Sequence, residues 1–368
     1  MSKNKKFFLQ AVAFCLIFAA TFFPIQEVFA RKSLEKPWDM TNKISGFYNE
    51  PEDEFAVMYF GSSHAYASFS PLEVWKQTGI KSYVFATQMQ PMWASVAYLK
   101  DALKTQKPAL VILECNMLYE DSEYAADSTN YSFMDDIPLS TNKIALAQVS
   151  AEKGGRFPLV FNFAKYHSRW ASLTAEDFSF RRSAVRDPYK GFVILPPKVG
   201  GDRIDRFDLR IDRFDLTGVQ DTDSLPLSAK NEQYLREFIE ICQENGIDLW
   251  LTKAPCNISP ENLQKMHAAA EIAAEYGVPF DDFNSEESYE AIGITAEDNF
   301  FDQRHMDIVG AGRFNDYFIP LLTARYPNLP ADPDDPEWQA DYETYQDAIA
   351  DAIANPVPGK TSTAAEDQ

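Results

Sequence analysis

The stretch "FAVMYFGSSHAYASFSP", residues 55–71, contains the transition that decides the fold. Its apolar part, residues 55–60, predicts a buried strand. Gly61 ends that strand in a small turn, and the turn presents Ser62, Ser63 and His64. Ligands of parallel sheets bind at the carboxyl ends of the strands. The stretch therefore predicts a hydroxyl at the mouth of a sheet, where a nucleophile can act.

Short apolar runs alternate with helical stretches along the chain. Strands are predicted at residues 55–60, 82–86, 109–114, 248–253 and 278–283, and helices at residues 71–78, 92–105, 231–244 and 260–276. This alternation is typical of an α/β fold, here a three-layer sandwich with a parallel sheet of about five strands. A long interruption after the third strand predicts a large insertion.

The chain of 368 residues is expected to have four parts. These are a signal peptide or membrane anchor at residues 1–30, the α/β domain at 31–118 and 226–326, an insertion or cap at 119–225, and an acidic, partly disordered tail at 327–368. The insertion contains the tandem repeat RIDRFDL at 203–209 and 210–216, which predicts a lengthened hairpin or loop. Within the tail, a weak helix is predicted at 337–354, with Trp338 and Tyr345 on one side.

The N-terminus predicts the compartment. Three lysines precede the mostly apolar stretch 7–23, and residues 28–30 (VFA) form a weak cleavage pattern. A cleaved signal peptide and a retained anchor differ only in whether a peptidase cuts after Ala30. In both cases the positive-inside rule places the following chain outside the cytoplasm. A buried amphipathic helix is disfavoured, because the segment has no polar face.

Composition excludes some classes of ligand. The formal net charge of −21 argues against nucleic-acid binding, which needs clustered Lys and Arg. Residues 331–368 hold ten acids and one lysine, so the charge is a poor guide to the substrate. Cys115 and Cys256 each end a predicted strand, which leaves a disulfide open, although free buried thiols are favoured. No metal and no cofactor is expected, since neither metal-ligand spacing nor a glycine-rich phosphate loop is present.

A second informative stretch is "NFFDQRHMDIVGAGRFNDYF", residues 299–318. Asp302 and His305 are three residues apart, which in a turn or helix start lets both side chains face the same way. Gly310 and Gly312 are expected to let the following helix pack closely. The residue types suit a serine nucleophile, whose proton an imidazole takes while a carboxylate fixes the imidazole tautomer. Ser63 is thus the predicted nucleophile, His305 the base and Asp302 the orienting acid.

These two motifs, with the β/α alternation between them, resemble the SGNH (GDSL-like) hydrolase superfamily over roughly residues 50–325. The N-terminal segment, residues 47–71 and the phrase KPALVILE (107–114) look most like its membrane-anchored extracytoplasmic members. Those are the DltD-type proteins of teichoic-acid D-alanylation and the alginate O-acetyltransferase relatives. The resemblance implies an SGNH/flavodoxin-like fold and a Ser-His-Asp enzyme that makes or breaks acyl esters. It implies as partners an acyl donor, a cell-envelope glycan and a membrane-bound O-acyltransferase.

The resemblance also suggests binding residues. The family's oxyanion glycine and its GxND motif have no counterpart, so Gln88 or Gln90 and Asn116 are the candidate oxyanion donors. His64 and His167 are candidate substrate contacts. His64 is expected to point to the opposite side of the turn and to brace the loop. For His167, a structural role packed among aromatic residues is favoured over a substrate contact.

Three functions remain open at this stage. The first is acyl transfer to a hydroxyl of an envelope polysaccharide through an acyl-Ser63 intermediate. The second is a carboxylesterase acting on small acyl esters. The third is a non-catalytic SGNH-fold module that assists a membrane-bound O-acyltransferase, for which Ser63→Ala should leave function intact.

Overall fold

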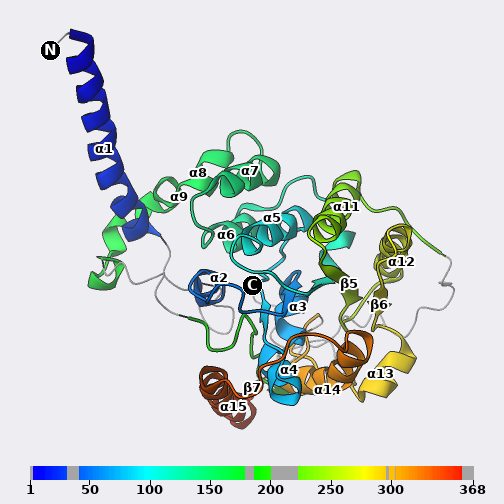
Figure 1. Ribbon diagram of the computed structural model, residues 1–368. Coiled ribbons are helices and arrows are strands. Elements are labelled where there is room, and N and C mark those ends of the chain that lie inside the picture. The colour runs from blue at the N-terminus through cyan, green and yellow to red at the C-terminus, as the bar shows by residue number, and fades with distance from the viewer. Residues whose placement is uncertain are drawn as a thin grey trace, which may run out of the picture.

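The computed structural model describes residues 3–30, 41–178, 186–199, 223–295, 298–302 and 304–358. At its centre is a five-stranded parallel sheet with the order β2-β1-β3-β5-β6 (Figure 1). The strands are β1 (Val57–Phe60), β2 (Ser82–Val84), β3 (Leu110–Glu114), β5 (Asp248–Lys253) and β6 (Phe280–Asp282). Each lies within its predicted range, so the predicted α/β fold is confirmed.

The central strands are apolar throughout because both faces of the sheet are covered. Every residue of β1 and β3 is buried, as expected for parallel strands with helices on either side. Phe60 pairs with Leu113 between β1 and β3, and Glu114 pairs with Thr252 between β3 and β5. The carboxyl ends of these three strands therefore lie side by side at one edge of the sheet.

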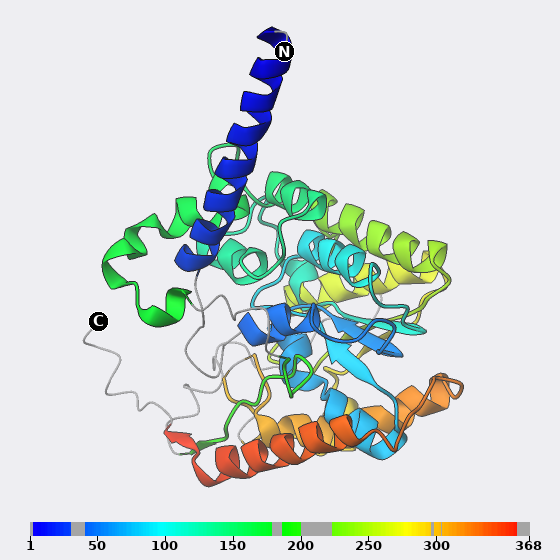
Figure 2. The same cartoon turned by 60° about the vertical axis from the view of Figure 1, so that its left-hand side comes forward.

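Helices form the outer two layers (Figures 1 and 2). One layer holds α5 (Met92–Ala102), α11 (Ala229–Glu244) and α12 (Pro260–Glu275), and the other holds α3 (Ser63–Ser68), α4 (Pro71–Thr78) and α14 (Ile308–Arg325). Phe60 packs edge-on against Phe238 of α11 at 5.7 Å, and Trp250 stacks on Phe318 of α14 at 5.0 Å. Large aromatic contacts thus join the sheet to both layers.

The insertion after β3 is mainly helical. It contains η1 (Asn116–Tyr119), α6 (Asp127–Met134), α7 (Thr141–Ser150), α8 (Arg156–Val160), α9 (Asn162–Tyr166), η2 (His167–Ser172), η3 (Ala175–Phe178) and the short strand β4 (Lys198–Val199). Asn142 of α7 donates to the carbonyl of Ala97 on α5 at 2.8 Å, and Ser132 of α6 donates to the carbonyl of Gln88 at 3.0 Å. These contacts hold α6 near the carboxyl edge of the sheet. The tandem repeat at 203–216 lies outside the described residues.

The acidic C-terminal region carries a long helix, α15 (Pro336–Ala354), which packs against α4. Trp338 is 1% exposed and donates to Glu54 at 2.9 Å, and Ser70 donates to the Tyr345 hydroxyl at 2.9 Å. Helix α15 is therefore an integral part of the α/β body. Strand β7 (Val357–Pro358) pairs with β4, and α2 (Thr41–Phe47) and α13 (Glu286–Ile292) complete the described elements. Residues 359–368, predicted to be disordered, lie outside the described part.

Helix α1 (Lys3–Phe29) projects from the body at the end opposite α15 (Figure 2). Its length and composition are sufficient to cross a membrane, and its apolar side chains are exposed over that span. Helix α1 is therefore not a buried amphipathic helix, the alternative that the sequence disfavoured. Its C-terminal end is nevertheless docked, because Ala30 is fully buried and Arg169 donates to the carbonyls of Phe29 and Ala30.

The four cysteines are all unpaired. Cys115, Cys242 and Cys256 are buried, whereas Cys15 lies exposed on α1. The disulfide between the two strand-end cysteines does not form, and the favoured free thiols are observed.

Candidate active site

The turn after β1 depends on a glycine. Gly61 has φ +143°, and a Cβ built there would lie 2.8 Å from the carbonyl oxygen of Glu114. Only glycine therefore lets the chain turn this close to β3. Ser62 then caps α3 by accepting a hydrogen bond from the backbone N–H of His64 at 3.5 Å. Ser63 is thereby the first residue of α3, with its side chain at the carboxyl edge of the sheet.

A short loop before α14 supplies the two other residues of the predicted triad. An antiparallel bridge between Phe300 and Met306 closes this loop. Within it, Asp302 Oδ1 accepts the backbone N–H groups of Arg304 and His305, each at 2.8 Å. These bonds turn both side chains of the DxxH motif in the same direction, as the spacing predicts.

Helix α14 begins immediately after the loop. Asp307 caps it by accepting the backbone N–H groups of Val309 and Gly310, at 3.0 and 2.9 Å. A Cβ on Gly310 would lie 2.2 Å from the carbonyl of Asn299, so glycine is needed there. Gly312 has open space around it, and the expectation that it too serves close packing is wrong.

Ser63, His305 and Asp302 form a continuous hydrogen-bonded chain. Ser63 Oγ lies 2.7 Å from His305 Nε2, and His305 Nδ1 lies 2.8 and 2.9 Å from the two carboxyl oxygens of Asp302. Burial acts to raise the pKa of Asp302, but its hydrogen bonds with His305 and with backbone N–H groups hold that pKa below the ordinary value. Asp302 is thus ionised beside the imidazole, the arrangement that activates a serine.

Ser63 opens into a cavity of about 310 Å³. Helix α6 of the insertion supplies one wall, and the segments after β1, β2 and β3 together with the loop before α14 supply the others. The lining residues are Ser63, His64, Tyr66, Gln88, Met89, Asn116, Met117, Ser128, Thr129, Ser132, Asp302, Arg304 and His305. A smaller cavity of about 110 Å³ shares His64, Asn116 and Arg304 with it. The site therefore has a main chamber and a side chamber.

The other predicted site residues separate into two groups. Asn116 and Gln88 line the main chamber with Ser63. Gln90 does not, because its amide is buried between Thr87 and Ser95, at 3.0 Å from each. His167 also lies apart from the site, with Nδ1 2.9 Å from the carbonyl of Ala164. It is exposed on the insertion, so the expectation that it packs among aromatic residues is wrong.

His64 is not where the sequence analysis expects it. Instead of pointing away from the nucleophile, it lines the same chamber, and its ring centroid lies 5.1 Å from that of His305. Burial lowers the pKa of His64 well below the ordinary value, and the positive charge of Lys253 lowers it further. The site thus holds a second, neutral imidazole beside the one that contacts Ser63.

A buried ion pair that was not predicted from the sequence lies behind this imidazole. Lys253 ends β5 and Glu114 ends β3; both side chains are fully buried and their charged atoms lie 3.3 Å apart. Burial acts to lower the pKa of Lys253, but Cys256 and the Glu114 carboxylate raise it above the ordinary value. The available signal was a charged residue at the end of each of two apolar runs, in strands that turn out to be neighbours.

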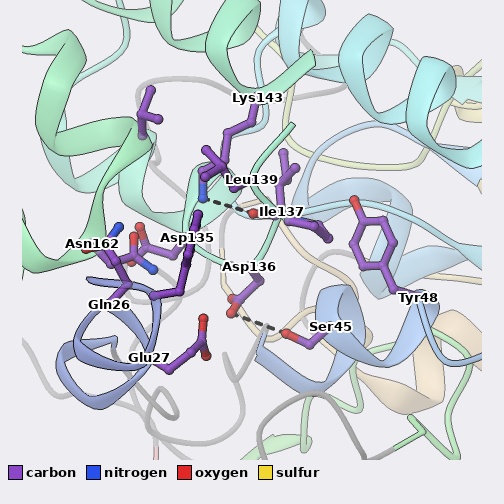
Figure 3. A pocket seen from close by; sticks show the side chains of 13 residues that line it. Gln26, Glu27, Ser45, Tyr48, Asp135, Asp136, Ile137, Leu139, Lys143 and Asn162 are labelled. Atoms are coloured by element: carbon purple, nitrogen blue, oxygen red, sulfur yellow. Dashed lines mark hydrogen bonds between the residues drawn. The ribbon is translucent and has the colours of Figure 1, made fainter. Parts of the chain in front are cut away.

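Another cavity, of about 240 Å³, lies where the end of α1 meets the insertion (Figure 3). Lys143 donates there to the carbonyl of Ile137 at 2.9 Å, and Ser45 donates to Asp136 at 3.4 Å. It contains no member of the hydrogen-bonded chain around Ser63. Within the described ranges, no three His, Cys, Asp or Glu side chains are grouped so as to hold a metal ion.

Comparisons with known proteins give a likeness in structure but none in sequence. No protein-family model matches the chain, and no curated protein matches it in sequence. Among solved structures, that of a "putative acylhydrolase" from Bacteroides fragilis NCTC 9343 is similar over 76% of this chain and 93% of its own. The sequence identity is 11% and the TM-score 0.35.

Proposed function

We propose that this protein is a serine enzyme that forms and breaks acyl esters through Ser63. One observation carries the proposal: the unbroken hydrogen-bonded chain from Asp302 through His305 to Ser63, which opens into a cavity at the carboxyl edge of the sheet. Its distances suit general-base activation of a hydroxyl.

In the first half of the reaction, Ser63 Oγ attacks the carbonyl carbon of an acyl ester. His305 Nε2 accepts the serine proton, and the Asp302 carboxylate stabilises the resulting imidazolium. When the tetrahedral intermediate collapses, the imidazolium returns the proton to the leaving alcohol, and an acyl-Ser63 ester remains. In the second half, His305 deprotonates water or a hydroxyl, which attacks this ester and releases Ser63.

The oxyanion requires donors beside Ser63. As the first residue of α3, Ser63 has no intrahelical acceptor for its own backbone N–H. The side-chain amides of Asn116 and Gln88 line the same chamber. These three groups are the proposed donors. Two thioethers, Met89 and Met117, add apolar surface for the acyl chain.

We further propose that the acceptor is a hydroxyl of a cell-envelope glycan and that the enzyme stays anchored by α1. The docked end of α1 supports retention, because the bond after Ala30 would have to leave a buried position and lose contacts with Arg169 before a peptidase could cut it. An extracytoplasmic domain held at the membrane meets envelope polymers, and a membrane-bound O-acyltransferase is the proposed source of acyl groups.

Labelling with a serine-reactive fluorophosphonate tests the proposal. The fluorophosphonate is added to the full chain in detergent, in four forms: wild type, Ser63→Ala, His305→Ala and the matched control His267→Ala. His267 lies on α12 and contacts the backbone carbonyl of Asp223, away from the site. Labelling should occur in wild type and His267→Ala and disappear in the other two variants. Equal labelling of Ser63→Ala would reject the proposal, and an unlabelled wild type would favour the non-catalytic module.

The acceptor is tested separately. Acyl-Ser63 formed from a small acyl ester is chased with buffer or with a hydroxyl-bearing envelope glycan, and loss of the acyl mass is followed. A transferase predicts faster loss with the glycan and a new glycan ester. If the acyl mass is lost at the same rate in buffer and with the glycan, and the product is the free acid, the protein is a carboxylesterase. The intact mass of the protein from cells reports whether residues 1–30 are retained.

A further inference from the structure

Four ionisable side chains are packed together directly behind the serine turn. They are His64, Glu114, Lys253 and Cys256, and each is at most 3% exposed. The Lys253 ammonium is at their centre. It lies 2.9 Å from the carbonyl of Ala254, 3.1 Å from Cys256 Sγ, 3.3 Å from Glu114 Oε1 and 3.5 Å from His64 Nδ1. The proposed reaction uses none of these side chains as nucleophile, base or orienting acid.

The surroundings of Lys253 and Glu114 indicate a charged pair. Glu114 receives donors only: Lys253 and the backbone N–H of Ala254 at Oε1, and the backbone N–H of Asn116 at Oε2. A carboxylate accepts from all of them, whereas a protonated carboxyl would have to donate. With a carboxylate and a carbonyl oxygen in reach, Lys253 is an ammonium, which can donate but cannot accept.

A lysine that only donates determines the tautomer of its histidine neighbour. The contact between Lys253 Nζ and His64 Nδ1 is attractive only when Nδ1 has a free lone pair, which places the imidazole proton on Nε2. The ring lines both chambers at the point where they meet. Among the described residues, Nε2 of His64 has no hydrogen-bond acceptor.

We infer that Lys253 holds His64 as a neutral imidazole whose Nε2–H donates a hydrogen bond to an oxygen of the acyl ester bound at Ser63. This inference rests on the proposed function of Ser63. His64 is then a substrate-contacting residue and Lys253 a positioning residue. The two imidazoles have separate tasks: His305 accepts the serine proton, and His64, with its Nδ1 lone pair directed at Lys253, is a donor only.

The tautomer can be measured without any reaction. The chain has four histidines, so long-range ¹H–¹⁵N spectra of the full chain with ¹⁵N-labelled histidine contain few signals, and single His→Gln variants assign them. His64 should show an unprotonated Nδ1 and a protonated Nε2 at neutral pH. The opposite tautomer, or protonation of both nitrogens at neutral pH, would overturn the inference.

The role of Lys253 is tested with a charge-balanced variant, because removing the ammonium alone would leave the buried Glu114 carboxylate without its ion-pair partner. In Lys253→Met/Glu114→Gln, no charge from either residue remains. The other titratable or charged groups near His64 are then His305, Arg304 and Cys256, the last two lining the side chamber with it. His64 should gain a proton at a higher pH than in wild type, or lose its single tautomer. An unchanged His64 spectrum would show that Lys253 does not position it.

The donor is tested by the rate of fluorophosphonate labelling. His64→Phe keeps a flat ring but has no donor, and it should slow labelling about a hundredfold, as for loss of one preorganised donor. His64→Gln returns an N–H near the Nε2 position and should recover most of the rate. Thermal unfolding confirms that each variant is folded. Equal rates for wild type and a folded His64→Phe, with Ser63→Ala unlabelled, would reject the inference while the proposed function stands. An unlabelled wild type rejects the function, and with it the inferred donor role.

Discussion

Asp302→Asn separates the geometry of the triad from its protonation state. Asp302 Oδ1 accepts two backbone N–H groups, those of Arg304 and His305. An asparagine can keep both bonds with its own Oδ1. Its amide nitrogen then replaces Oδ2, which lies 2.9 Å from His305 Nδ1. An amide nitrogen only donates, whereas Oδ1, which also lies 2.8 Å from His305 Nδ1, already accepts two backbone N–H groups. The substitution therefore favours the His305 tautomer with a lone pair at Nδ1 and its proton on Nε2. That proton faces Ser63 Oγ, so the imidazole can no longer accept the serine proton.

The cost of this tautomer change is large. In a serine protease the equivalent substitution lowers turnover by about 10⁴-fold, which corresponds to about 5 kcal/mol of transition-state stabilisation. We expect a fall of the same order in the second-order rate of fluorophosphonate labelling, measured on the full chain by gel fluorescence. The midpoint of urea unfolding at neutral pH should fall only by the small stabilisation that ionised Asp302 provides, because the loop keeps its backbone bonds. Labelling within tenfold of wild type in a folded Asp302→Asn variant would refute the assigned roles of Asp302 and His305.

Other parts of the structure give further predictions. Lys253→Met should destabilise the fold by about 3–5 kcal/mol, since it leaves a buried carboxylate unpaired, and adding Glu114→Gln should recover much of that loss in urea unfolding. Gly61→Ala should abolish labelling and lower stability by more than about 1 kcal/mol, because of its positive φ and the contact with a backbone carbonyl; unchanged labelling would contradict this. Trp338→Ala should cost about 3–5 kcal/mol because Trp338 is buried between α15 and the body, and an unfolding midpoint equal to wild type would contradict this. The folded state lowers the pKa of Asp302, so the stability that Asp302 contributes is present above the ordinary pKa of 3.8 and is lost as the pH falls through the lower folded-state pKa. Asp302→Asn should therefore flatten the plot of unfolding free energy against pH below about pH 4. Equal slopes of that plot for wild type and variant would argue against this.

The fold could be predicted because its signal is local. A parallel strand covered on both faces must be apolar at every position, so the runs 55–60 and 109–114 are visible without knowledge of their neighbours. The positions of Ser63 and of the DxxH motif follow from the same strand and helix boundaries. What remained hidden was the order of the strands. Lys253 and Glu114 appear in the sequence as unrelated polar ends, and only the pairing of β3 with β5 brings them together.

The environments of the histidines were harder to predict for the same reason. His167 lies in a segment rich in aromatic residues, yet the chamber wall comes from α6, an earlier part of the insertion. His64 follows Ser63 directly, and adjacency in sequence suggested opposite sides of the turn. On a short helix that begins at Ser63, however, two successive side chains can both border one cavity, and Lys253 draws the ring of His64 toward β5.

Two imidazoles beside one serine pose an electrostatic problem that the buried lysine resolves. If His64 became protonated, its charge would disfavour the imidazolium that His305 must form during the reaction, since their rings are 5.1 Å apart. A permanent ammonium behind His64 prevents this by making a second positive charge unfavourable there. The same ammonium would also disfavour the His305 imidazolium if it were uncompensated, and Glu114 offsets its charge at 3.3 Å. On this reasoning, Glu114→Gln alone should slow labelling even in a folded protein, whereas the double variant with Lys253→Met should be less impaired.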